Sequence, residues 1–147
     1  MIYWDTSCIL KLYAPEDDSG DYMRLAEKFG PLCTSDLAKT ELFYGLIRKE
    51  AAGDIAPGAA QIAFASFLTD EGKGRFMFIP LGEDVRAEAE KVALRCYRRT
   101  SPVAIRTLDG LHLATALVAA LEEIATADER MLQALPLLEL RAKKAKD

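Results

Sequence analysis

The sequence predicts an α/β fold in which a mostly parallel sheet is covered by helices on both faces. Short apolar runs alternate along the chain with longer amphipathic stretches, the order typical of strands that alternate with helices. The apolar runs are continuous, which indicates strands that are buried on both faces. No repeat or linker divides the 147 residues, so we expect a single domain over residues 1–147.

Five apolar runs are the expected strands. The first, Ile2-Tyr3-Trp4, stops at Asp5-Thr6-Ser7. The second stops at Ser35-Asp36, a pair that favours the start of a helix. In chain order, the expected strands cover residues 2–4, 31–34, 76–81, 124–126 and 137–140.

Stretches with apolar residues at helical spacing separate these runs. They predict helices over residues 18–29, 36–52, 57–69, 84–100 and 108–122. Helices on both faces of a sheet of four to five strands form a three-layer α/β/α sandwich. In open parallel sheets, sites form beyond the carboxyl ends of the strands, so functional residues are expected directly after the strands.

Composition excludes several classes of protein. Hydrophobic residues make up 50% and charged residues 29% of the chain, which excludes disordered and fibrous proteins. No apolar run approaches the ~20 residues of a membrane helix, and the first residues lack the pattern of a secretion signal. Cys8, Cys33 and Cys96 show neither a disulfide nor a zinc-binding spacing. We therefore expect a cytoplasmic protein that does not bind a membrane.

The net charge of −4 is unevenly distributed along the chain. Residues 141–147 carry a balance of +3 and are expected to form a frayed basic tail, so the remaining 140 residues carry −7. A body this acidic argues against sequence-independent coating of DNA, which needs a basic surface. The positions of the acids are therefore more informative than the net charge.

Four acids lie where such a fold would form a site. Asp5 directly follows the first expected strand, and Asp128 follows the fourth. Glu41 shares a helix face with Leu37, so it is expected to point toward the body of the protein. Asp109 lies in the first turn of an expected helix whose neighbouring face is small and apolar. These positions predict that the four carboxylates gather at one edge of the sheet.

Three of these acids, taken singly, have structural explanations. Asp5 suits a turn, Asp109 is favoured by the helix dipole, and Asp128 suits a helix N-cap. Glu41 differs, because a glutamate on a buried face needs a partner. Together, four carboxylates without matching basic residues in the same segments repel one another unless a cation neutralises them. Oxygen ligands without pairs of Cys or His favour Mg²⁺ or Mn²⁺ over zinc.

The chain resembles the PIN-domain family of metal-dependent ribonucleases, and most closely the VapC-type toxins of bacterial toxin–antitoxin modules. The resemblance rests on four segments in the family's order, residues 2–7, 35–42, 106–116 and 126–130. It implies that catalysis depends on Asp5, Glu41, Asp109 and Asp128. In this comparison Asp5 and Asp109 bind metal directly, and Asp128 binds it directly or through water. Glu41 orients or deprotonates the attacking water, or holds a second metal.

The resemblance also implies a cofactor, a reaction and partners. The protein would be an endoribonuclease that uses Mg²⁺, with Mn²⁺ able to substitute, and that leaves a 5′-phosphate and a 3′-hydroxyl. A protein antitoxin would silence it, and we expect a homodimer. The alternative is a catalytically idle PIN fold that binds RNA or protein. The intact set of acids favours the nuclease, because a binding module has no use for four mutually repelling carboxylates.

Further residues are candidates for supporting roles. Ser7 and Thr126 match hydroxyl positions that support the acids or the metal site in the family. His112, the only histidine, is expected to pack against the turn that carries Asp109 and not to act as an acid or base. The candidate contacts for the RNA backbone are Lys11, Arg95, Arg98, Arg99 and Arg106. A solvated helix end explains the arginines equally well.

Overall fold

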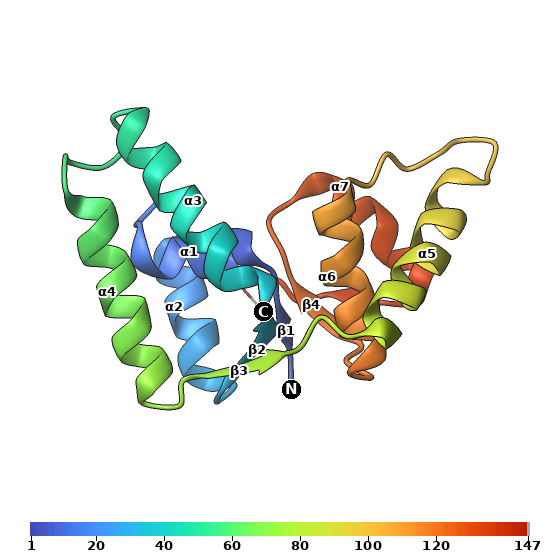
Figure 1. The fold of residues 1–147 in the computed structure, drawn as a ribbon, viewed down its shortest axis with the longest axis horizontal. Coiled ribbons are helices and arrows are strands. Elements are labelled where there is room, and N and C mark those ends of the chain that lie inside the picture. The colour runs from blue at the N-terminus through green and yellow to red at the C-terminus, as the bar shows by residue number, and fades with distance from the viewer. Residues whose placement is uncertain (147) are drawn as a thin grey trace.

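The computed structural model describes residues 1–146, which contain a sheet of five parallel strands (Figure 1). The strands are β1 (Tyr3–Trp4), β2 (Leu32–Ser35), β3 (Phe76–Ile79), β4 (Glu123–Ala125) and β5 (Arg141–Ala142). Their order across the sheet is β3-β2-β1-β4-β5. β2 and β3 therefore lie on one side of β1, and β4 and β5 lie on the other side. The predicted fold with a parallel sheet is confirmed.

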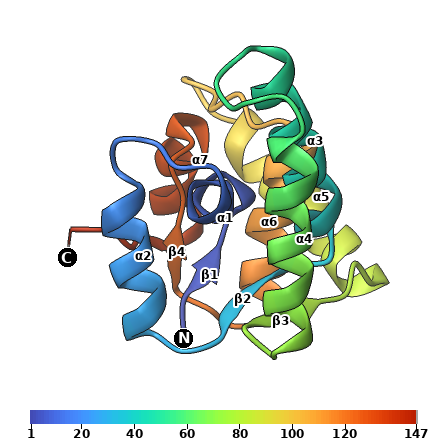
Figure 2. The same cartoon turned by 90° about the vertical axis from the view of Figure 1, so that its left-hand side faces the viewer.

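Helices cover both faces of the sheet and complete three layers (Figure 1 and Figure 2). One layer consists of α1 (Thr6–Tyr13), α2 (Ser19–Lys28), α3 (Leu37–Ala51) and α4 (Ala59–Gly72). The other consists of α5 (Glu83–Tyr97), α6 (Thr107–Val118), α7 (Glu129–Ala134) and the 3-10 helix η1 (Leu135–Leu138). Within residues 1–146, no helix is both long and apolar enough to cross a membrane.

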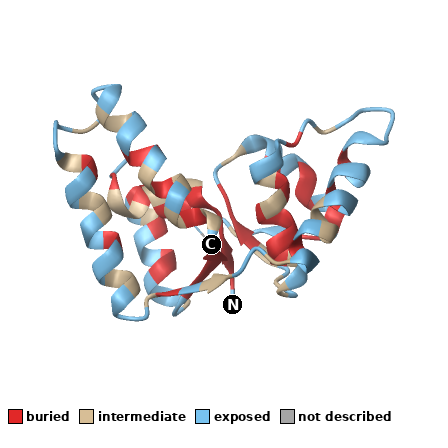
Figure 3. Cartoon of the chain, in the orientation of Figure 1, coloured by how far each residue is buried: buried red, intermediate tan, exposed pale blue. Residues whose placement is uncertain are grey.

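Two hydrophobic cores form because side chains along β1 alternate between the faces of the sheet. Trp4 packs with the layer of α1–α4, and its ring meets that of Tyr22 edge-on with centroids 6.5 Å apart. Tyr3 belongs to the opposite core, which includes residues of α5, α6 and α7. All four residues of β2 are buried, as expected for a strand covered on both faces (Figure 3).

The first helix was not predicted, although it carries part of the site. α1 begins directly after β1 with Thr6 and includes Cys8 and Ile9, residue types of modest helix propensity. Both Cys8 and Ile9 are fully buried in the core. Tertiary packing therefore stabilises a helix that local propensity does not indicate.

The fifth strand lies later in the chain than predicted. Residues 137–140 were expected to form it, but they belong to η1 and to the turn that follows. Pro136 stands in the first turn of η1, and Glu139 adopts a left-handed conformation with φ of 59°. Proline cannot donate to a sheet ladder, whereas its fixed φ suits the start of a helix. The strand forms at the next segment, which pairs in parallel with β4.

The prediction of a frayed tail over residues 141–147 is wrong at its start. The first two residues form β5, and the N–H of Lys143 donates to the carbonyl of Ile124 at 2.8 Å. Ala145 packs against the core on the side of α1–α4. Residue 147 lies outside the described part of the chain. The segment is ordered because β4 would otherwise leave its backbone unpaired, while the charged side chains remain in water.

We expect Phe67→Ala to destabilise the protein by about 3–5 kcal/mol, because it empties the centre of an aromatic cluster. The buried Phe67 ring lies 5.0 to 5.6 Å from the rings of Tyr13, Phe64 and Phe76, measured between centroids. Equilibrium urea unfolding measures the loss. Leu68→Ala, which truncates the exposed neighbour, should change the stability by about 0.5 kcal/mol or less. Equal losses for the two variants would contradict this packing.

Candidate active site

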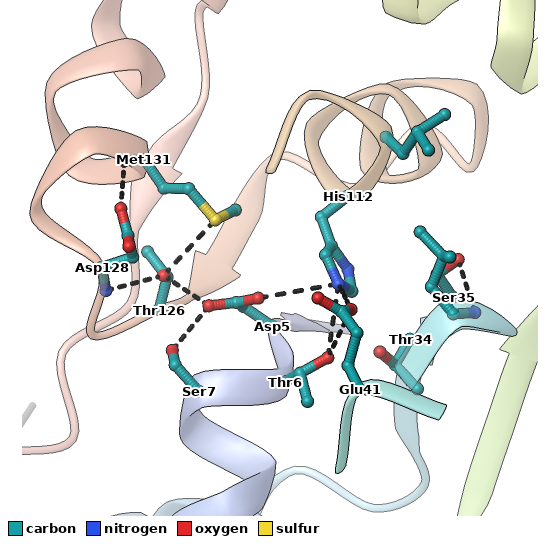
Figure 4. Close-up of polar contacts among 12 residues, drawn as sticks. Asp5, Thr6, Ser7, Thr34, Ser35, Glu41, His112, Thr126, Asp128 and Met131 are labelled. Atoms are coloured by element: carbon teal, nitrogen blue, oxygen red, sulfur yellow. Dashed lines mark hydrogen bonds and ion pairs between the residues drawn. The ribbon is translucent and has the colours of Figure 1, made fainter. Parts of the chain in front are cut away.

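Asp5 lies at the carboxyl end of β1, beside the point where the strand order reverses between β1 and β4 (Figure 4). Its backbone N–H continues the ladder by donating to the carbonyl of Ala125 at 2.9 Å. Its Oδ2 accepts hydrogen bonds from the hydroxyls of Ser7 at 2.5 Å and Thr126 at 2.9 Å. The two hydroxyl residues singled out in the sequence thus both contact Asp5, one from α1 and one from the segment after β4.

Glu41 reaches the same region from the second turn of α3. Its Oε1 accepts a hydrogen bond from the Thr6 hydroxyl at 3.0 Å and a second one from Nε2 of His112 (Figure 4). Burial alone would raise the pKa of Glu41. The hydrogen bond and charge of His112 outweigh burial and lower the pKa below its ordinary value, with smaller contributions from Thr6 and Arg48. Glu41 therefore has the partner that a glutamate on a buried face requires.

His112 is buried between β1 and α3, with 1% of its surface exposed. Its Nδ1 lies 2.6 Å from the hydroxyl oxygen of Tyr3, and its Nε2 lies 3.8 Å from Oδ1 of Asp5. Burial would lower the pKa of His112, but the hydrogen bond to Glu41 and the charge of Asp5 raise it overall. The sequence analysis expected contact with the turn that carries Asp109, whereas the hydrogen bonds of this side chain reach other elements.

The other two acids come from the starts of α6 and α7. Asp109 occupies the first turn of α6. Asp128 is the N-cap of α7, and its Oδ1 accepts from the backbone N–H groups of Arg130 and Met131 at 2.9 and 3.0 Å. Burial raises the pKa of Asp109 above its ordinary value, and the negative charges of Asp128 and Asp5 raise it further. Repulsion among these acids therefore adds to the effect of burial on the pKa of Asp109.

One pocket of about 250 Å³ brings the four acids together. Three of them keep one oxygen that accepts no hydrogen bond from residues 1–146, namely Oδ1 of Asp5, Oε2 of Glu41 and Oδ2 of Asp128. Arg48 is the one basic residue among the described residues that line the pocket. The pocket is therefore acidic and polar, with free carboxylate oxygens and a single cationic side chain at its wall.

The chemistry of these donors suits a hard divalent cation. Carboxylate oxygens are the ligands that Mg²⁺ and Mn²⁺ prefer, and a cation would relieve the repulsion that raises the pKa of Asp109. Among residues 1–146, no group of three or more His, Cys, Asp or Glu side chains is placed so that it could hold a metal ion. The four acids line one pocket without forming such a group.

Arg48 lines the pocket, although it was not among the predicted site residues. This residue follows Glu41 by about two turns of α3, so both side chains lie on one face of the helix. Arg48 is exposed, and its guanidinium forms no ion pair within residues 1–146. The helical spacing from Glu41 is the sequence signal that identifies it.

Lys11 lies outside the pocket that contains the four acids. Its Nζ forms ion pairs with Glu16 and Asp18, each at 2.7 Å, and its side chain is buried. The charge of Lys11 is paired with two carboxylates in the α1–α2 connection, and its contact with an RNA phosphate stays a prediction.

The four predicted arginines do not line the pocket. Arg95 lies in the last turn of α5, Arg98 and Arg99 follow that helix, and Arg106 directly precedes α6. All four are exposed. The segment between the two helices leads to the turn of α6 that contains Asp109 (Figure 1).

A comparison with models of known protein families agrees with this geometry. The sequence matches the model described as PIN domain over residues 2–135, a range that contains all the residues that line the pocket. A search of curated proteins found no match. Because the match extends over most of the sequence, the chain belongs to the PIN domain family.

Proposed function

We propose that this protein is an endoribonuclease that depends on Mg²⁺ bound at the four-carboxylate pocket, with Mn²⁺ able to substitute. The convergence of Asp5, Glu41, Asp109 and Asp128 on one pocket carries the proposal. The pKa of Asp109, raised first by burial, supports it as well, because the charges of Asp128 and Asp5 raise it further and a cation would relieve that repulsion. Family membership also supports it, since PIN domains are generally nucleases that use divalent metals.

The residues of the pocket suit distinct roles. Asp5 and Asp109 are proposed to bind the metal directly, and Asp128 directly or through water. When bound, a divalent cation activates a water molecule and stabilises negative charge on the phosphoryl oxygens. Two hydroxyls hold Asp5 through Oδ2 and leave Oδ1 for the cation. Glu41 is the proposed acceptor for a proton or hydrogen bond of the attacking water, through its free Oε2.

Arg48 is the proposed contact for the phosphate next to the cleaved bond. A guanidinium binds phosphate oxygens through paired N–H donors, and this one lines the pocket without an ion-pair partner among residues 1–146. Without Arg48, the charged residues among the described residues that line the pocket would all be acids, which repel phosphate. Arg95, Arg98, Arg99 and Arg106 are proposed contacts for phosphates farther along the strand.

The finer proposal is a cytoplasmic toxin of a type II toxin–antitoxin pair, acting as a homodimer. The four sequence segments that resemble VapC-type toxins support it. An antitoxin that places an Arg or Lys among the acids would supply the charge that the pocket lacks and so exclude the metal. The alternative is an idle PIN fold that binds RNA or protein, and the following measurements distinguish the two.

Mn²⁺ should raise the melting temperature of the wild type by about 5–10 °C at 100 times its dissociation constant, because only the folded chain gathers the acids. Asp109→Asn relieves the repulsion at this position. The metal-free variant should therefore melt at or above the wild type and lose most of the Mn²⁺ response. Calorimetry with and without Mn²⁺ measures both effects.

The matched control for this measurement is Asp36→Asn. Asp36 also follows a strand but is exposed and lies outside the pocket, so this variant should keep the full response to Mn²⁺. A wild type that ignores Mn²⁺, together with a destabilised Asp109→Asn, would mean that Asp109 is a structural acid and would favour the idle binding module.

Asp5→Asn should lower the rate of RNA cleavage by about 100-fold or more, because it removes a proposed metal ligand at the centre of the site. Gel analysis of a labelled RNA, with Mg²⁺ or EDTA, measures the rate, and digestion by a 5′-phosphate-dependent exonuclease identifies the product ends. Induced expression in a bacterial host tests the toxin role separately. The wild type should arrest growth and Asp5→Asn should not; cleavage without growth arrest would leave a nuclease that is not a toxin.

Arg48→Gln should weaken RNA binding and reduce the slope of log affinity against log salt by about one, since one phosphate contact is lost. Fluorescence anisotropy of a labelled RNA over a salt series measures this slope. Arg86→Gln is the control, because Arg86 is paired with Glu83 and Glu90 on α5 and lies outside the pocket. Equal slopes for the wild type and Arg48→Gln would remove Arg48 from the substrate contacts.

A further inference from the structure

A buried chain of hydrogen bonds connects the centre of the sheet to the pocket. The hydroxyl oxygen of Tyr3, a fully buried residue of β1, lies 2.6 Å from Nδ1 of His112. On the other side of the ring, Nε2 of His112 bonds to Oε1 of Glu41 (Figure 4). Glu41 lines the pocket, and 23% of its side-chain surface is exposed. The chain therefore ends on the one acid of the pocket that is not assigned to the primary metal.

The direction of these hydrogen bonds follows from the groups that form them. A tyrosine hydroxyl is protonated near neutral pH and can donate or accept a hydrogen bond. An ionised carboxylate can only accept, so the hydrogen between His112 and Glu41 is carried by Nε2. This holds for the neutral ring, whose Nδ1 accepts from Tyr3, and for the fully protonated ring. His112 presents an N–H to Glu41 in both states.

Two donors converge on a single oxygen of Glu41. Thr6, the first residue of α1, donates to the same Oε1 that receives the N–H of His112. Two bonds from different elements fix the orientation of the carboxylate, whereas its Oε2 accepts no hydrogen bond from residues 1–146. A carboxylate held at one oxygen and open at the other is arranged to accept a hydrogen bond from within the pocket.

We propose that His112 is a positioning residue of the nuclease site: anchored by Tyr3, it holds Glu41 so that Oε2 is presented to the attacking water. This inference rests on the proposed function and assigns the histidine a role in the same site. Both ring nitrogens of His112 are already bonded within the protein. The histidine therefore acts through Glu41 and not as an acid or base toward the RNA.

A purely structural role is the competing explanation for a histidine buried this deeply. A buried ionic pair adds little stability compared with well-packed apolar residues, because both groups lose their contact with water. Removal of either partner leaves the other unpaired in the interior, so a loss of stability is expected under both explanations. A measurement of stability alone does not distinguish the structural role from the positioning role. The test therefore needs measurements that depend on how Glu41 is held.

Three variants provide these readouts. His112→Leu removes the donor to Glu41, His112→Gln keeps an amide N–H that reaches toward it, and Tyr3→Phe removes only the anchor of the ring. Under the proposal, kcat for RNA cleavage falls by about 10–100-fold in His112→Leu with KM unchanged. In His112→Gln, kcat is partly restored. Tyr3→Phe lowers kcat less than His112→Leu does. Cys96→Ala, in the same core but outside the pocket, controls for lost stability.

A double-mutant cycle tests whether His112 acts through Glu41. In the Glu41→Gln background, His112→Leu should lower kcat no further, because the carboxylate that it positions is already absent. The Mn²⁺-induced rise in melting temperature is the second readout. It should persist in His112→Leu, which retains the three proposed metal ligands. If His112→Leu does not fold, the same cycle is carried out with Tyr3→Phe, which leaves the ring in place.

The outcomes separate this inference from the proposed function. Additive losses in the cycle, or equal kcat values for His112→Leu and His112→Gln, would overturn the positioning role. Loss of the Mn²⁺ response in His112→Leu would also overturn it, because His112 would then hold the whole pocket together. A wild type that cleaves no RNA would overturn the function and the inference together, whereas an active wild type with an equally active His112→Leu would overturn the inference alone.

Discussion

Repulsion among four carboxylates at one edge of the sheet is the constraint to which the surrounding structure responds. Burial raises the pKa of Asp109, and repulsion from Asp128 and Asp5 raises it further. Hydrogen-bond donors surround the other three acids. Two hydroxyls donate to Asp5, two backbone N–H groups to Asp128, and a threonine and a histidine to Glu41. Each set of donors occupies one oxygen and leaves the other free. The carboxylates are thus held in place by donors that do not neutralise their charge.

Strand order explains how acids from distant parts of the sequence meet. β1 and β4 are neighbours in the sheet although one begins and the other nearly ends the chain. Because the strands are parallel, Asp5 and the segment that carries Asp128 emerge at the same edge. α3 starts there after β2, and α6 runs back across the sheet to β4, so it also begins at that edge. Glu41 and Asp109, in early turns of these helices, therefore face the switch point, where parallel sheets bind their ligands.

The failures of the sequence analysis share a cause, which is competition from tertiary contacts. α1 has weak local signals and is stabilised by burial of Cys8 and Ile9. The fifth strand forms later in the chain than predicted. Pro136 favours a helical turn, and the segment after that turn pairs with the edge of β4. For α1 and for the partner of β4 the deciding contacts lie in other segments of the chain, so local pattern could not reveal them.

Local residue pattern by itself determined the alternation of strands and helices, the parallel sheet and the four acids that follow or begin these elements, because hydrophobic periodicity and turn residues act over short distances. Only the tertiary structure decided what surrounds each acid. In the folded chain, hydrogen bonds connect Tyr3 to His112 and His112 to Glu41, and Arg48 lines the pocket. The fold also decides which carboxylate oxygens accept no hydrogen bond within residues 1–146. Side-chain hydrogen bonds depend on distances between elements far apart in the chain, and those distances are set when both faces of the sheet pack against their helices.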